Sequence, residues 1–133
     1  MADFSDLTAV LVNCSLVRDP QQSHTRRLLS RVAGVMASEG VGVELVHALE
    51  HQIAFGMVKD ATEYGAERDD WPALHATIMD ADILVVGSPI WLGVKSSVAT
   101  LVIERMYAYS GCLLYTSDAA DEDWLGGVGG GGG

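Results

Sequence analysis

The stretch DILVVG, residues 82–87, decides the fold of this 133-residue chain. Its apolar centre is a short continuous run, which is typical of a strand buried on both faces, as in a parallel sheet. A second such run, LTAVLV, occupies residues 7–12, and residues 41–46 partly alternate between apolar and polar side chains. We therefore expect three strands, at about 7–13, 41–47 and 82–88.

Helical patterns separate the expected strands. Apolar residues recur at helical spacing after Ser23, which is the expected N-cap of a first helix. A second helix is expected to follow Asp70, as its cap, and to end near Asp80. A third is expected to follow Ser96 or Ser97. Strands that alternate with helices predict an α/β fold with a parallel sheet and right-handed crossovers.

Two expected loops follow strands at the carboxyl edge of this sheet, residues 13–25 and 88–97, and ligands bind at that edge in open sheets of this kind. Residues 48–70 show scattered glycine and charge without a clear period, which indicates a long loop. The functional site is therefore expected in the first two loops.

Charge and cysteine content restrict the function classes. The chain has 18 acidic and 8 basic residues, for a formal net charge of −10, which argues against nucleic acid or an anionic membrane as the main partner. The polar N-terminus is unlike a signal peptide, and no apolar run approaches the length of a membrane span. Outside the last segment Cys14 is the only cysteine, which suits a reducing cytoplasm.

The first loop, residues 13–25, combines hydroxyl groups, Arg18 and a helix N-terminus. Free backbone N–H groups and the helix dipole favour an anion there, so phosphate is the natural occupant. The alternative is that Ser23 merely caps the helix and Ser15 merely turns the chain. The first loop contains neither G-x-G-x-x-G nor G-x-x-x-x-G-K-[ST], so the usual dinucleotide fingerprint and the P-loop are absent after the first strand.

The second loop places Pro89, Trp91 and Gly93 close together. Trp91 can lie along a flat ring system, Pro89 stiffens the loop, and Gly93 lets backbone N–H groups approach ring heteroatoms. The alternative is that Trp91 packs against a neighbouring subunit or the loop itself.

Two other features favour plain interpretations. His47 and His51 have the i, i+4 spacing of metal ligands on a helix, but His47 is expected at a strand end, so no metal site is predicted. Cys14 could be a reactive thiol near a helix N-terminus, although a small loop residue is the simpler interpretation.

Several segments of the chain resemble the flavodoxin-like NAD(P)H-dependent FMN reductases and related oxidoreductases. The matching segments are LVNCSL at 11–16, SHT at 23–25, DWP at 70–72, and residues 82–97, which together span nearly all of residues 7–106. The resemblance implies a flavodoxin-like, doubly wound parallel sheet, here in the order 2-1-3. It also implies FMN as cofactor and NAD(P)H as co-substrate.

The resemblance also implies the site residues. The residues carried over are Ser15, Ser23, His24 and Thr25 for the FMN phosphate, and Pro89, Ile90, Trp91, Leu92 and Gly93 for the isoalloxazine ring. The family commonly has Asn where His24 stands. Arg18 is a further candidate partner of the phosphate.

The implied activity is hydride transfer from a nicotinamide to the flavin, and then electron transfer to a quinone or flavin acceptor. The flavin performs this chemistry, so no catalytic acid, base or nucleophile is predicted. The expected partners are a small-molecule acceptor and further copies of the chain in a homo-oligomer, with neither nucleic acid nor membrane. The alternatives are an electron-transfer flavodoxin, which is a carrier rather than an enzyme, and an inactive fragment.

The last segment, residues 111–133, is expected to be a non-native, disordered tail. Residues 112–122, CLLYTSDAADE, resemble one translated frame of a sequencing adapter, and seven of the last eight residues are glycine, as translated poly-G would be. The alternative is a natural acidic, glycine-rich tail. On the first interpretation residues 1–110 are an FMN-binding domain truncated after its third strand, and the chain as given is expected to be inactive.

Overall fold

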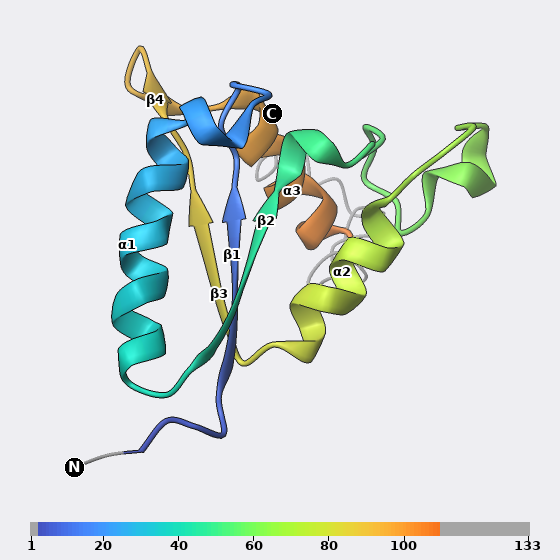
Figure 1. Ribbon diagram of the computed structural model, residues 1–133. Helices are drawn as coiled ribbons and strands as arrows, with labels where there is room; N and C mark the ends of the chain where they lie inside the picture. The colour runs from blue at the N-terminus through green and yellow to red at the C-terminus, as the bar shows by residue number, and fades with distance from the viewer. Residues whose placement is uncertain (1–2, 110–133) are drawn as a thin grey trace, which may run out of the picture.

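Three parallel strands form the sheet of the computed structural model, which describes residues 3–109 (Figure 1). They are β1 (Thr8–Asn13), β2 (Gly42–His47) and β3 (Ile83–Gly87), in the order β2-β1-β3. In the register, Leu11 lies opposite Leu45 on one side and Val85 on the other. The predicted strands, their direction and their order are confirmed.

Helices cover both faces of the sheet, which explains why the centre of β1, residues 9–12, is apolar. Figure 1 shows α1 (His24–Ser38) on one face, and α2 (Trp71–Asp80) and α3 (Ser97–Tyr107) on the other. On the first face Leu11 packs with Leu29 of α1. On the second, Val12 shares a buried cluster with Trp71 of α2 and Val102 of α3. Alternate residues of β1 are therefore withdrawn from water on opposite sides of the sheet.

Serine side chains cap two of the helices as expected. Ser23 Oγ accepts a hydrogen bond from the N–H of Arg26 at 3.0 Å, and Ser96 Oγ accepts one from Ala99 at 3.1 Å. Asp70 occupies the N-cap position of α2 as expected, but its carboxylate makes no cap hydrogen bond to the helix.

The neighbouring carboxylate binds the start of α2 instead. Asp69 Oδ1 accepts from the N–H of Trp71 at 3.2 Å, while Asp70 Oδ2 accepts from the N–H of Gln52 at 2.6 Å. Because Asp69 and Asp70 both precede α2, the sequence did not show which of the two carboxylates binds the start of the helix.

Residues 88–95, predicted as a loop, contain a short antiparallel hairpin of β4 (Ile90–Trp91) and β5 (Val94–Lys95). Its two turn residues have positive φ angles, 52° at Leu92 and 81° at Gly93. Positive φ at both positions is the type I′ arrangement, whose twist matches that of the flanking strands. Gly93 is thus required by the turn, whatever else its backbone approaches.

The long segment before α2 also differs from a plain loop. It contains the 3-10 turns Ala48–Glu50 and Ala61–Tyr64, and in Figure 1 its green and yellow-green course extends away from the sheet beside α2. Arg105 of α3 anchors it: Arg105 Nη2 lies 2.7 Å from Asp69 Oδ2, and Nη1 lies 3.1 Å from Oδ1. Both side chains are fully buried.

Backbone groups satisfy the remaining hydrogen-bonding capacity of this buried ion pair. The guanidinium also donates to the carbonyl oxygens of Ala54, Val58 and Lys59. The carboxylate also accepts from the N–H groups of Ala54, Ala61 and Trp71. A buried charge is tolerated only when it is paired and hydrogen-bonded in this way, so residues 54–69 owe their fixed position to Arg105.

Acid should weaken this anchor. Burial alone would raise the pKa of Asp69, but the hydrogen bonds from Arg105 and three backbone N–H groups outweigh it and lower the pKa from 3.8 to about 2. A depressed carboxyl pKa contributes stability that is present above the unfolded value and lost as the pH falls through the folded value. We expect the free energy of unfolding to fall by about 2 kcal/mol from this group between pH 4 and pH 2.

Urea unfolding at several pH values, followed by circular dichroism, measures this effect. Asp69→Asn should be less stable at neutral pH and should lack this part of the acid dependence. Equal slopes for the variant and the unmodified chain between pH 4 and pH 2 would show that another carboxylate is responsible.

Candidate functional site

Two loops meet at the carboxyl edge of the sheet through Cys14. Its backbone N–H donates to the carbonyl oxygen of Gly87 at 2.8 Å, and its carbonyl oxygen accepts from Ser96 Oγ at 2.8 Å. The N–H of Ser96 in turn donates to Ser88 Oγ at 2.9 Å. The predicted first and second loops are therefore joined by hydrogen bonds at one end of the sheet.

Gly87 brings the start of α1 close to the same edge. A Cβ atom at this position would lie 2.9–3.0 Å from side-chain atoms of Leu29, which is closer than such contacts allow. Leu29 is buried in the cluster between α1 and the sheet. The absence of a side chain at Gly87 thus lets α1 pack tightly against the end of β3, next to both loops.

The start of α1 offers free donors. Ser23 Oγ accepts from the N–H of Arg26, but the N–H groups of His24 and Thr25 have no acceptor within the described part of the chain. His24 is exposed and Thr25 is half-buried. Free N–H groups at a helix N-terminus, together with the positive end of the helix dipole, favour an anion there.

The hydroxyl groups of Ser15 and Ser23 face inward. Ser15 Oγ accepts from the N–H of Val17 at 3.0 Å, and Ser23 is 0 % exposed. Their observed contacts are therefore the turn and the cap that the sequence left open as alternatives. Of the four residues predicted for the phosphate, His24 and Thr25 are accessible, and contacts from Ser15 and Ser23 to a ligand stay predictions.

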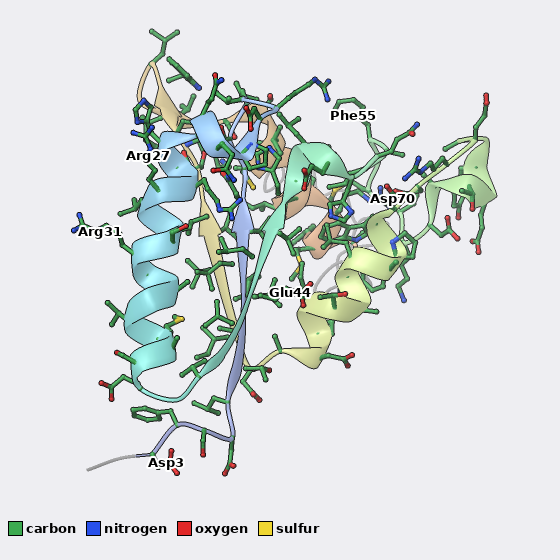
Figure 2. All side chains as sticks on the ribbon, viewed as in Figure 1. Asp3, Arg27, Arg31, Glu44, Phe55 and Asp70 are labelled. Carbon is green, nitrogen blue, oxygen red and sulfur yellow. The ribbon has the colours of Figure 1, made fainter. Side chains whose placement is uncertain are left out.

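Arginine residues are concentrated in the first loop and in α1, although the chain as a whole is acidic. Four of its eight basic residues lie between positions 18 and 31, and none of them forms an ion pair within residues 3–109. Figure 2 shows Arg27 and Arg31 on the side of α1 that faces away from the sheet. Together with Arg26 they line a cavity of about 460 Å³. This local positive charge suits a phosphate at the first loop.

The second loop presents apolar side chains to solvent. Trp91 is 57 % exposed, Ile90 and Val94 are exposed, and Leu92 is fully exposed at the tip of the hairpin. Pro89 is half-buried at its base. Among the described residues the ring of Trp91 has no aromatic partner, and more than half of the residue is exposed to solvent.

The surroundings of Cys14 disfavour a reactive thiol. It is fully buried, and burial raises the pKa of its thiol from 9.0 to about 12. The thiolate, which is the reactive form, is therefore scarce at neutral pH. The simpler interpretation of Cys14, as a small residue in the loop, agrees with this burial.

His47 binds protein atoms. Its Nδ1 lies 3.0 Å from Asn13 Nδ2, and its Nε2 lies 3.0 Å from the carbonyl oxygen of Val17. No group of three potential metal ligands occurs among residues 3–109. Within the same residues, no helix is long and apolar enough to cross a membrane.

The parallel order β2-β1-β3, with helices on both faces and two loops at its carboxyl edge, defines a flavodoxin-like α/β domain. The chain belongs to the NADPH-dependent FMN reductase family, whose sequence model matches residues 8–128. The match continues beyond residue 110; the predicted non-native, disordered tail lies outside the described residues.

Two curated proteins resemble this chain. A protein named divalent metal cation transporter MntH, from Mycobacterium bovis, is 47% identical over 110 residues, which are 83% of this chain and 16% of that protein. The 8-demethyl-8-aminoriboflavin-5'-phosphate synthase of Streptomyces davaonensis is 31% identical over 105 residues, which are 75% of this chain and 41% of that protein. The chain thus spans less than half the length of either relative.

A solved structure supports the same assignment. The crystal structure of RosB with bound 8-demethyl-8-formylriboflavin-5'-phosphate superposes with a TM-score of 0.67 at 32% identity, covering 75% of this chain and 42% of that one. The family and these flavin-related proteins support a flavin-dependent oxidoreductase role.

Sequence reasoning missed the buried residues whose hydrogen bonds support the first loop. Asn13 was not singled out, His47 was considered only as a metal ligand, and Ser96 only as a cap. The available signal was positional: Asn13 and His47 end adjacent parallel strands and lie opposite each other in register. Polar residues that end neighbouring buried strands meet at one sheet edge.

Proposed function

We propose that this chain provides the FMN-binding part of an oxidoreductase that passes electrons from NAD(P)H through bound flavin to a quinone or flavin acceptor. The observation that carries the proposal is the pair of N–H groups at His24 and Thr25, which have no acceptor within residues 3–109. They start the helix that follows the first loop, and Cys14 of that loop is hydrogen-bonded to the segments on either side of the exposed hairpin. Family membership supplies the cofactor class. RosB, whose crystal structure holds a riboflavin 5'-phosphate derivative, supports a flavin that carries a phosphate.

The proposed roles follow from the exposure of each residue. The N–H groups of His24 and Thr25, with the Thr25 hydroxyl, donate to the phosphate, while Ser15 and Ser23 shape the loop beneath it. Trp91 and its hairpin lie along the ring. When bound, FMN supplies the redox chemistry, and the protein supplies binding and orientation.

The assembly and location of the protein form part of the proposal. The exposed apolar hairpin and the outer edge of β3, which pairs with no further strand within residues 3–109 and where Leu84 and Val86 are each 37 % exposed, support association into a homo-oligomer. The acceptor is a small molecule, and the location is cytoplasmic.

Fluorescence titration with FMN and riboflavin tests the phosphate assignment. We expect FMN to bind at least tenfold more tightly, since hydrogen bonds to a charged group typically contribute about 1.5–3 kcal/mol. In a Trp124→Phe background, FMN should quench the exposed Trp91, and Trp91→Leu should abolish that quenching while the buried Trp71 remains as reference. Equal affinity for the two flavins would contradict the phosphate site, and unchanged quenching would place the ring elsewhere.

Addition of NADPH to the flavin-loaded protein separates an enzyme from a carrier. Reduction of bound FMN without a partner reductase is expected, and it shows as loss of the oxidised flavin absorbance. A flavin that stays oxidised until a separate reductase is added would favour the electron-transfer flavodoxin.

A further inference from the structure

A buried polar pair, Asn13 and His47, lies beneath the first loop. Asn13 ends β1 and is 1 % exposed, while His47 ends β2 and is 5 % exposed. The two residues are register partners across the parallel strands. Neither is among the residues that the proposed function places in contact with the flavin.

Hydrogen bonding fixes which atom of each side chain donates. Asn13 Oδ1 accepts from the N–H of Ser15 at 3.0 Å, so Nδ2 is the donor that faces His47 Nδ1 at 3.0 Å. His47 Nδ1 is then the acceptor. Its Nε2 carries the hydrogen and donates to the carbonyl oxygen of Val17 at 3.0 Å. This chain of bonds requires the neutral imidazole with its proton on Nε2.

The pair holds the loop at three points. Asn13 binds the N–H of Ser15 and, at 3.3 Å, the hydroxyl oxygen of Ser23, which caps α1. His47 binds the carbonyl oxygen of Val17. The N–H groups of His24 and Thr25, at the start of the helix that Ser23 caps, have no acceptor within residues 3–109 and remain free for a phosphate.

We propose that His47 is a positioning residue of the phosphate site, acting through Asn13 and the carbonyl group of Val17 in its neutral Nε2–H form. This inference rests on the proposed function, because it deepens the same site. His47 does not touch the ligand. It sets the shape of the loop that does.

Two substitutions separate this role from simple packing. His47→Leu fills the space but makes neither hydrogen bond. His47→Gln can accept from Asn13 through its side-chain oxygen and donate to the Val17 carbonyl through its nitrogen. We expect FMN affinity to fall at least tenfold in His47→Leu, with riboflavin affinity unchanged, and to stay within about threefold in His47→Gln. His51→Leu is the matched control, and it should bind FMN as the unmodified chain does.

Imidazole nitrogen NMR shifts of the unmodified chain provide a second measurement that needs no variant to fold. The Nε2–H tautomer is expected at His47, and the Nδ1–H tautomer would overturn the inference. Normal FMN affinity in His47→Leu, or affinity in His47→Gln as low as in His47→Leu, would also overturn it.

Titration of the unmodified chain with inorganic phosphate, followed through the amide signals of His24 and Thr25, separates the two proposals. Phosphate binding without FMN binding would end the proposed function alone, and His47→Leu should then weaken phosphate binding. Binding of neither ligand would overturn both.

Discussion

Replacement of Arg105 by methionine is expected to lower the free energy of unfolding by about 3–5 kcal/mol. Methionine keeps much of the unbranched side chain but removes the charge that pairs with Asp69 inside the protein. The Asp69 carboxylate would be left buried, and the carbonyl groups of Ala54, Val58 and Lys59 would lose a donor. Since small domains have only about 5–15 kcal/mol of stability, this loss would unfold a large share of the molecules on moderate warming.

The chain contains its own control for this experiment. Arg68 pairs with Asp70 at 2.9 Å, but its side chain is 62% exposed. An exposed ion pair typically contributes about 0–1 kcal/mol, so Arg68→Met should change stability little. Urea unfolding of both variants, followed by circular dichroism, measures the difference. A loss below about 1 kcal/mol for Arg105→Met would show that residues 54–69 are not held by this ion pair.

The sheet was predictable because each of its strands carries a local signal. Residues 9–12 of β1 are apolar because helices cover both faces of the sheet there. Residues 83–86 of β3 form a similar apolar run, although Leu84 and Val86 are each 37 % exposed. The caps at Ser23 and Ser96 are equally local, since a serine side chain bonds an N–H group three residues ahead. Such features need no knowledge of the rest of the fold.

Contacts between distant residues could not be predicted in this way. Asp69 and Arg105 are separated by 36 positions, and nothing near either one marks it as buried. A charged residue in a sequence is normally assigned to the surface, so residues 48–70 looked like a free loop. The hairpin at residues 90–95 was not predicted for a different reason. Its turn places Leu92 at a positive φ angle, which leucine rarely adopts.

The same distinction between local signals and contacts of distant residues applies to the candidate site. The loops themselves follow from the ends of strands, so their location was predictable. Which hydroxyl groups face outward was not, because Ser15 and Ser23 turn inward to bonds with Val17 and Arg26. The support from His47 depends on the register of β1 and β2, which the sequence specifies only through the whole sheet.

Removal of the hydroxyl groups at Ser23 and Thr25 together is expected to weaken FMN binding at least tenfold. The two groups act differently. Thr25 is half-buried at the second position of α1, beside the free N–H groups, so its hydroxyl can reach a phosphate directly. Ser23 is buried, and its loss removes a helix cap, which typically costs about 0.5–2 kcal/mol of stability.

The single variants therefore distinguish direct from indirect binding. If the phosphate binds Thr25 directly, Thr25→Ala alone should account for most of the tenfold loss and should leave urea stability almost unchanged. Ser23→Ala should lower the free energy of unfolding. Its effect on FMN affinity should be indirect, through loss of order at the start of α1. Thr77→Ala, at a half-buried position of α2, is the matched control and should alter neither quantity. FMN affinity that is unchanged in the double variant would remove the phosphate from the start of α1.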